Sequence, residues 1–137
     1  MTGETTLLRF PSRVESIDEA TSAAAEAARR SGLPDEAVFG VDMAVREAVT
    51  NAVLHGNRQD ERKAFELGLR QGGASFVVTV RDEGEGFDPA SVPDPTDPQN
   101  LLKASGRGIL FMRTFMDEVT WERHPEGGTV VRMTKNR

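Results

Sequence analysis

The sequence predicts an α+β protein, because two helical segments in its first half are followed by two β-hairpins. Apolar residues recur at helical spacing before residue 56. Short, partly alternating runs joined by glycine-containing turns come afterwards. The chain has 137 residues, of which 37% are hydrophobic and 28% charged, an ordinary globular composition. This length favours one domain, residues 1–137, with a core of its own.

Composition and charge exclude several classes of protein. The net charge of −5, without a basic patch, argues against a nucleic-acid binder. The chain has no cysteine, so disulfides, thiolate metal sites and cysteine nucleophiles are excluded. No apolar run approaches transmembrane length and no leader opens the chain, so we expect a soluble cytoplasmic protein without a membrane partner.

A short strand and an alanine-rich helix are predicted at the start of the chain. Residues 5–10 are rich in strand formers and are followed by proline, which suits an edge strand. Ser16 is the predicted N-cap of the helix, because acidic residues follow it in the first turn. We expect this helix to run to Arg30 and to end with Gly32 as its C-cap.

The second predicted helix begins at Pro34 and stops near residues 56–57. The border of its apolar arc carries Glu47, Asn51 and His55, which are four residues apart and therefore lie in one file. A carboxylate and a carboxamide one turn apart can reach a single ligand. A solvated helix edge has the same pattern, and a histidine at a helix end is more often structural than catalytic.

Two glycine motifs and the loop between them follow the first hairpin. The hairpins are expected at residues 63–70 with 75–81 and at residues 118–123 with 129–134. A strand leads directly into D-x-G-x-G, and G-x-G comes immediately before a predicted helix, where open N–H groups suit an anion. Residues 90–105 between them contain three prolines and are predicted to form a mobile lid. The motif residues are Asp82, Gly84 and Gly86, and Gly106, Arg107 and Gly108.

Taken in order, these motifs resemble the Bergerat ATP-binding fold of gyrase, histidine-kinase catalytic domains and small bacterial anti-sigma-factor kinases. E-x-x-x-N, D-x-G-x-G, a lid and G-x-G occur in that sequence along the chain. The segments EAVTNAVLHGN and SGRGILFMRTFMDEV are similar to the anti-sigma-factor kinases in particular. The resemblance covers nearly the whole chain. It implies a two-layer α/β sandwich with a mixed, mostly antiparallel sheet and helices on one face.

The resemblance also implies roles for the residues that match the family's motifs. Glu47 would be the general base for an incoming hydroxyl, and Asn51 would be a ligand of Mg²⁺. Asp82 would accept the adenine amino proton, supported by Thr129 through its hydroxyl or a bridging water. The backbone would approach the base at Gly84 and Gly86, and the phosphates at Gly106, Arg107 and Gly108.

One position departs from the family's pattern. Some members carry an arginine two residues before the first glycine of G-x-G, where this chain has Ala104. Lys103 and Arg107 flank that position, and either cation can supply the charge for the terminal phosphate. A solvated lid cation would have the same sequence, so the replacement stays open.

The implied function is that of an ATP- and Mg²⁺-dependent serine/threonine kinase. It would phosphorylate an antagonist protein and sequester a sigma factor, so the expected partners are a sigma factor and a STAS-type anti-anti-sigma protein. The family suggests a homodimer. A competing hypothesis is a non-catalytic, nucleotide-gated binding module, which would use the lid only as a switch. A third is a catalytic domain that serves a separate receiver or phosphatase partner.

Overall fold

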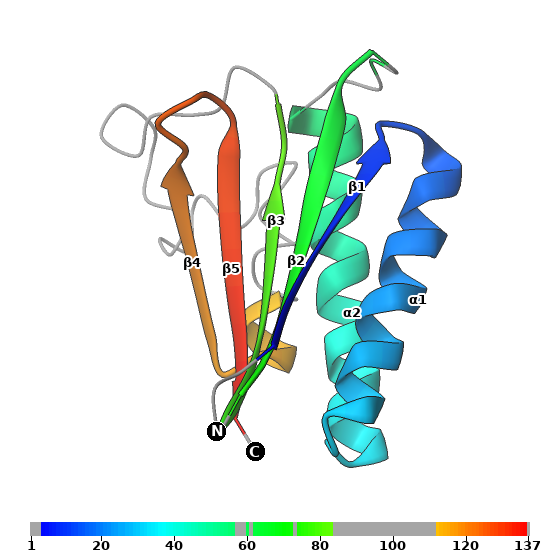
Figure 1. Ribbon diagram of the computed structural model, residues 1–137, viewed down its shortest axis with the longest axis vertical. Helices are drawn as coiled ribbons and strands as arrows, with labels where there is room; N and C mark the ends of the chain where they lie inside the picture. The colour runs from blue at the N-terminus through cyan, green and yellow to red at the C-terminus, as the bar shows by residue number, and fades with distance from the viewer. Residues whose placement is uncertain (1–3, 57–59, 61, 73, 84–111, 137) are drawn as a thin grey trace.

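The computed structural model describes residues 4–56, 60, 62–72, 74–83 and 112–136. A five-stranded sheet is covered on one side by two long helices (Figure 1). A further helical turn at 112–115 precedes the last hairpin. The elements are β1 (Glu4–Pro11), α1 (Val14–Arg30), α2 (Asp35–Asn51), the π-helical turn η1 (Ala52–Gly56), β2 (Ala64–Gly72), β3 (Ser75–Arg81), β4 (Glu118–Arg123) and β5 (Thr129–Asn136).

The strands lie in the order β1-β2-β3-β5-β4. β1 is at one edge, as its terminal proline predicted, and β5 lies between β3 and β4 (Figure 1). The four pairings among the described strands are all antiparallel. The two-layer α+β architecture is therefore confirmed, with a more uniform sheet than the mixed one that we expected.

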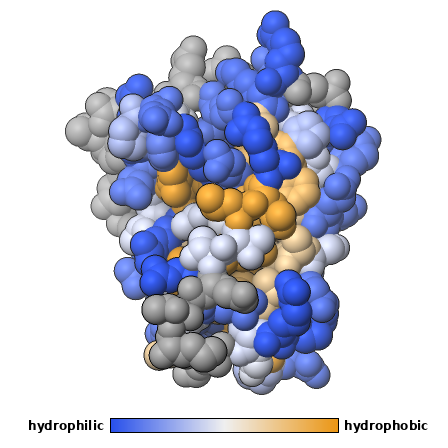
Figure 2. Space-filling model, viewed as in Figure 1, coloured by the Kyte–Doolittle hydropathy of each residue, from blue (hydrophilic) through white to orange (hydrophobic). Residues whose placement is uncertain are grey.

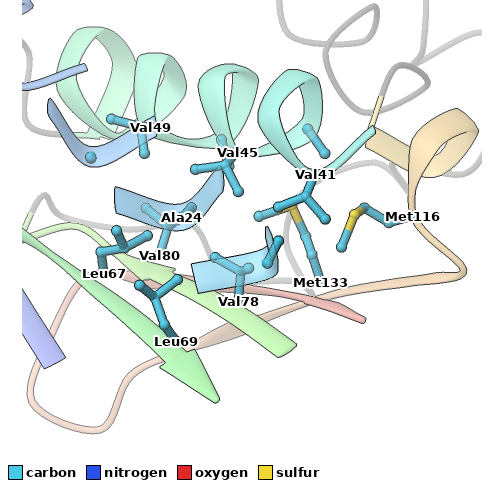
Figure 3. Close-up of a cluster of buried hydrophobic side chains, with 14 of the residues drawn as sticks. Ala24, Val41, Val45, Val49, Leu67, Leu69, Val78, Val80, Met116 and Met133 are labelled. Carbon is cyan, nitrogen blue, oxygen red and sulfur yellow. The ribbon is translucent and has the colours of Figure 1, made fainter. Parts of the chain in front are cut away.

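The core lies between the helices and the inner face of the sheet. Figure 3 shows Val41, Val45 and Val49 pointing from α2 toward the strands. α1 contributes small side chains that are fully buried, among them Ala20 and Ala24, so its backbone can approach its neighbours closely. Apolar burial stabilises the fold by about 1.5–3 kcal/mol for each large side chain. The largest fully buried side chains are Phe65, Leu67, Phe76, Val78, Val80, Met112 and Met133, together with Val41, Val45, Val49 and Val53.

The ends of α1 differ in how well the sequence predicted them. The helix begins at Val14 with Arg13 as N-cap, so the prediction that Ser16 caps it was wrong. Ser16 is buried in the first turn, and its N–H donates to the Arg13 carbonyl. This hydrogen bond shows that the helix has already begun before Ser16. At the other end, Gly32 has φ +91°. The N–H groups of Gly32 and Leu33 close a Schellman motif, which confirms a glycine-terminated helix.

The second helix changes character at Asn51. Its α-helical part runs from Asp35 to Asn51, and the expected last turn is instead the π-helical turn η1. Ala52 and Val53 are consecutive and both buried. A π turn holds more residues than an α turn, so successive side chains are rotated less relative to each other. Two neighbouring apolar side chains can therefore both face the core. Such turns are common at functional sites.

Part of the described surface is apolar. Figure 2 shows apolar surface in the middle of the face seen in Figure 1, among hydrophilic side chains. The large exposed apolar side chains are Leu7, Val14 and Phe39. Phe39 packs edge-on against Phe115, with 5.9 Å between the ring centroids. In the described part of the chain, no helix has the length and apolarity needed to cross a membrane.

Candidate functional site

Asp82 and Thr129 meet where β3 ends and β5 begins. Asp82 is 7% exposed and Thr129 is 9% exposed. The Asp82 N–H donates to the Thr129 carbonyl over 3.1 Å, and the Thr129 N–H donates to Asp82 Oδ1 over 3.1 Å. The structure thus brings together two residues that the family resemblance implied would cooperate. The described support comes from the backbone N–H of Thr129, whereas we expected its hydroxyl or a water.

The carboxylate of Asp82 is oriented by this pairing. A buried charged group is costly unless hydrogen bonds satisfy it. The N–H of Thr129 meets that need at Oδ1, and the paired backbones fix where the side chain begins. An ionised carboxylate only accepts hydrogen bonds. A carboxylate held in this way suits recognition of an N–H donor, such as an exocyclic amino group.

Gly128 packs directly against Asp82. Its φ is +87°, which favours glycine, and a Cβ built on it would overlap the main-chain carbonyl oxygen of Asp82. The neighbouring Gly127 also has a positive φ, but a Cβ there would meet nothing within 4 Å. The role of Gly128 is not apparent from the sequence, because a glycine pair in a hairpin turn is ordinary. Nothing in the pair shows that one member must lack a side chain.

The residues on both sides of Asp82 are anchored as well. Arg81 Nη2 donates to the Gly127 carbonyl over 3.3 Å. Glu83 Oε1 accepts the N–H of Ala64 at 2.8 Å and Arg9 Nη2 at 2.6 Å. These contacts tie the exit of β3 to β1, to the start of β2 and to the β4–β5 turn. No local sequence pattern indicates these contacts, since each joins residues far apart in the chain.

Glu47 and Asn51 lie on consecutive turns of α2, and both are half-buried. In the described structure, neither side chain makes an ion pair or a hydrogen bond. Figure 1 shows that α2 ends at the same end of the molecule where β3 ends and β5 begins. The predicted carboxylate and carboxamide are therefore placed at the end of the molecule that carries Asp82 and Thr129.

Arg46, the neighbour of Glu47, is engaged elsewhere. Its Nη1 donates to Asp18 Oδ1 on α1 over 2.6 Å, and its Nε lies 3.8 Å from Asp42 Oδ1. The hydrogen bond to Asp18 raises the pKa of Arg46, and the charges of Asp42 and Asp18 add to this effect against partial burial. The guanidinium thus joins the two helices and leaves the carboxylate of Glu47 unneutralised.

Several predicted site residues lie outside the described residues. They are Gly84, Gly86, Lys103, Gly106, Arg107 and Gly108, together with the predicted lid at 90–105. The side chain of His55 lies outside the description too. Among the described residues, no three His, Cys, Asp or Glu side chains are grouped to hold a metal ion.

A family model supplies the identification. The model for the histidine kinase-like ATPase domain matches residues 10–135. The chain belongs to the histidine kinase-like ATPase domain family. The motifs that predicted this family therefore lie within the match.

Within the histidine kinase-like ATPase family, the chain is similar to curated anti-sigma F factors. It is 38% identical to the one from Bacillus velezensis over 96 residues, which is 67% of this chain and 64% of that protein. It is 33% identical to the one from a Thermoanaerobacter species over 132 residues, which is 93% of this chain and 90% of that protein. The chain thus spans just under two thirds of the Bacillus velezensis relative's length.

Solved structures of histidine kinase-like ATPase domains share the fold. The RsbU and RsbW domains of a Mycobacterium tuberculosis protein match with a TM-score of 0.65 at 17% identity, over 97% of this chain and 32% of that chain. The catalytic domain of histidine kinase ThkA matches with a TM-score of 0.58 at 14% identity, over 96% and 97%. These likenesses agree with the two-layer architecture.

Proposed function

We propose that this protein binds ATP with Mg²⁺, phosphorylates a serine or threonine of an antagonist protein, and sequesters a sigma factor. The observation that carries the proposal is the buried Asp82 carboxylate held by Thr129 in a chain of the histidine kinase-like ATPase family. The curated relatives are named anti-sigma F factors, which supports a sigma-factor partner. We therefore propose that the protein acts in the cytoplasm.

In this proposal, Asp82 recognises adenine, and Asn51 binds the Mg²⁺ that accompanies the phosphates. Asp82 accepts a hydrogen bond from the exocyclic amino group. Mg²⁺ favours oxygen ligands and usually keeps several waters, so the amide oxygen of Asn51 suits it. In this proposal the other ligands are phosphate oxygens and waters. The metal, when bound, neutralises charge on the phosphates.

Residues Gly84, Gly86, Gly106, Arg107 and Gly108 complete the proposed nucleotide site, with Lys103 or Arg107 in place of the arginine missing at 104.

Glu47 is the proposed general base. Its carboxylate takes the proton of the incoming hydroxyl as the hydroxyl oxygen attacks the terminal phosphorus and ADP leaves. The absence of an ion pair or hydrogen bond to Glu47 in the described structure supports this role, because a paired carboxylate is a weaker base. Base assistance is typically worth 10²–10⁴-fold in rate.

The proposed partners are a sigma factor, a STAS-type antagonist and a second copy of this chain. The sheet face away from the helices carries Leu7, which is 67% exposed and lies over Gly68. A single exposed leucine does not by itself mark an interface, so the proposed homodimer rests on the family resemblance. Sedimentation at several protein concentrations measures whether the chain forms a homodimer.

Replacement of Glu47 tests the kinase against the nucleotide-gated module. Glu47→Gln keeps the shape and removes the base, so transfer of labelled phosphate to the antagonist should fall by about two orders of magnitude or more. ATP affinity should stay within a few-fold of the unmodified protein. Asn51→Ala should instead weaken binding that depends on magnesium.

Glu36→Gln is the matched control, because Glu36 is an exposed carboxylate in the first turn of the same helix. It should leave transfer unchanged. If the unmodified protein transfers no phosphate to any partner that it binds, the kinase proposal fails and the binding module replaces it. If Glu47→Gln transfers phosphate at the normal rate, the kinase stands and Glu47 is not its base.

A further inference from the structure

Arg81 lies directly before Asp82, yet the proposed nucleotide contacts do not use it. Side chains alternate along β3, so Val80 faces the helices and Arg81 faces the opposite side of the sheet. Its cross-strand partner is Glu66 on β2, whose Oε1 lies 3.8 Å from Arg81 Nη1. Its Nη2 reaches the Gly127 carbonyl in the β4–β5 turn. Arg81 thus links β2 to the β4–β5 turn, on the sheet face away from the helices.

The guanidinium of Arg81 has little freedom. Its side chain is 22% exposed, and its Nε is buried without a hydrogen-bond partner among the described residues. An unpaired buried N–H is uncommon. The contacts that restrain the guanidinium are those of its two terminal nitrogens, with Glu66 and with the Gly127 carbonyl. Glu66 Oε1 also lies 3.6 Å from Arg9 Nη1, and Arg9 donates to Glu83. Charged side chains therefore anchor the backbone on both sides of Asp82.

The β4–β5 turn, which accepts a hydrogen bond from Arg81, also leads into the residues that contact Asp82. Gly127 is followed by Gly128, which packs on the Asp82 carbonyl, and by Thr129, whose N–H orients the carboxylate. A displacement of Gly127 would move both contacts together. We propose that Arg81 is a positioning residue that sets where the Asp82 carboxylate is offered to the amino group of adenine. This inference rests on the proposed nucleotide binding.

Discrimination between two purine nucleotides tests this role. ATP carries the amino group that Asp82 would bind, whereas inosine triphosphate carries a carbonyl oxygen there. A site built for an N–H donor rejects an analogue that lacks it. Arg81→Met keeps an apolar stem and removes the donors, so it should lower ATP affinity about tenfold and leave inosine triphosphate affinity unchanged. Phosphate transfer at saturating ATP should stay within a few-fold of normal.

Three further variants complete the experiment. Arg132→Met is the matched control, because Arg132 is an exposed arginine on the same sheet face, opposite Thr79 in the pairing of β3 with β5. It should leave the ratio of the two affinities unchanged. Asp82→Asn should abolish the preference for ATP. Arg81→Lys keeps a positive charge and one donor nitrogen, so it should retain part of the preference, and it decides the matter if Arg81→Met does not fold.

The outcomes separate this inference from the function on which it rests. If the unmodified protein binds no ATP, the proposed function is overturned, and the inference with it. If Asp82→Asn loses the preference while Arg81→Met keeps it in full, only the role of Arg81 is overturned. If Arg81→Met does not fold, full preference in Arg81→Lys has the same meaning. A lower melting temperature with an unchanged affinity ratio would mean that Arg81 serves stability alone, which also overturns the inference.

Discussion

The α1–α2 junction and the β4–β5 turn each contain a glycine with a left-handed backbone, but for different reasons. Gly32 has φ +91° and Gly128 has φ +87°. A Cβ added to Gly32 meets nothing within 4 Å, whereas one added to Gly128 overlaps the Asp82 carbonyl. At the junction, glycine satisfies the local need to end a helix. In the turn, the missing side chain is a requirement of the candidate site.

Gly128→Ala should have the largest effect. The left-handed conformation costs an ordinary residue about 1–2 kcal/mol, and the overlap with backbone adds displacement of the turn. We expect a loss of stability of about 3 kcal/mol or more, and a melting temperature lower by roughly 10 °C. ATP affinity should also fall by at least about tenfold, which calorimetric titration measures. Normal affinity would show that the turn does not position Asp82.

Gly32→Ala should have a smaller effect that is confined to stability. It carries the conformational cost of about 1 kcal/mol without any overlap. Gly32→Asn should cost less, because asparagine tolerates this conformation better than alanine. Urea unfolding measures both variants, and their ATP affinity should equal that of the unmodified protein. Reduced affinity in Gly32→Ala would contradict the distinction between the two glycines.

The ion pair between Arg46 and Asp18 should have the smallest effect, although it joins the two helices. Its side chains are 44% and 79% exposed, so water screens the charges. A double-mutant cycle with Arg46→Met and Asp18→Asn should give a coupling of about 0.2–1 kcal/mol. The coupling should decrease further in high salt. A value above about 2 kcal/mol would mean that this pair is a main support of the helical layer.

Local pattern predicted the elements where neighbours in sequence decide them. The hairpin of β2 and β3, the edge position of β1 and the glycine that ends α1 follow from alternation, proline and helix capping. The cap at Ser16 failed because the chain already turns at Arg13. The π-helical turn after Asn51 has no local signal, since packing of Ala52 and Val53 against the core accompanies it.

The candidate site was predictable only in part. The order of the motifs indicated Asp82, the family resemblance added Thr129, and the structure joins the two residues. The roles of Gly128 and Arg81 come from contacts across strands, so spacing along the chain does not reveal them. The roles of Glu47 and Asn51 and of the residues between 84 and 111 stay predictions.

The position of β5 has a consequence for how the protein is made. It is the last described strand in sequence, yet it lies inside the sheet, between β3 and β4. Thr129 follows Asp82 by 47 residues, which a ribosome adds in roughly 2–9 seconds. Throughout that interval β3 has an open edge, which is a template for pairing with other chains. A factor that shields this edge during synthesis would keep β3 free to pair with β5, and so to bring Asp82 into contact with Thr129.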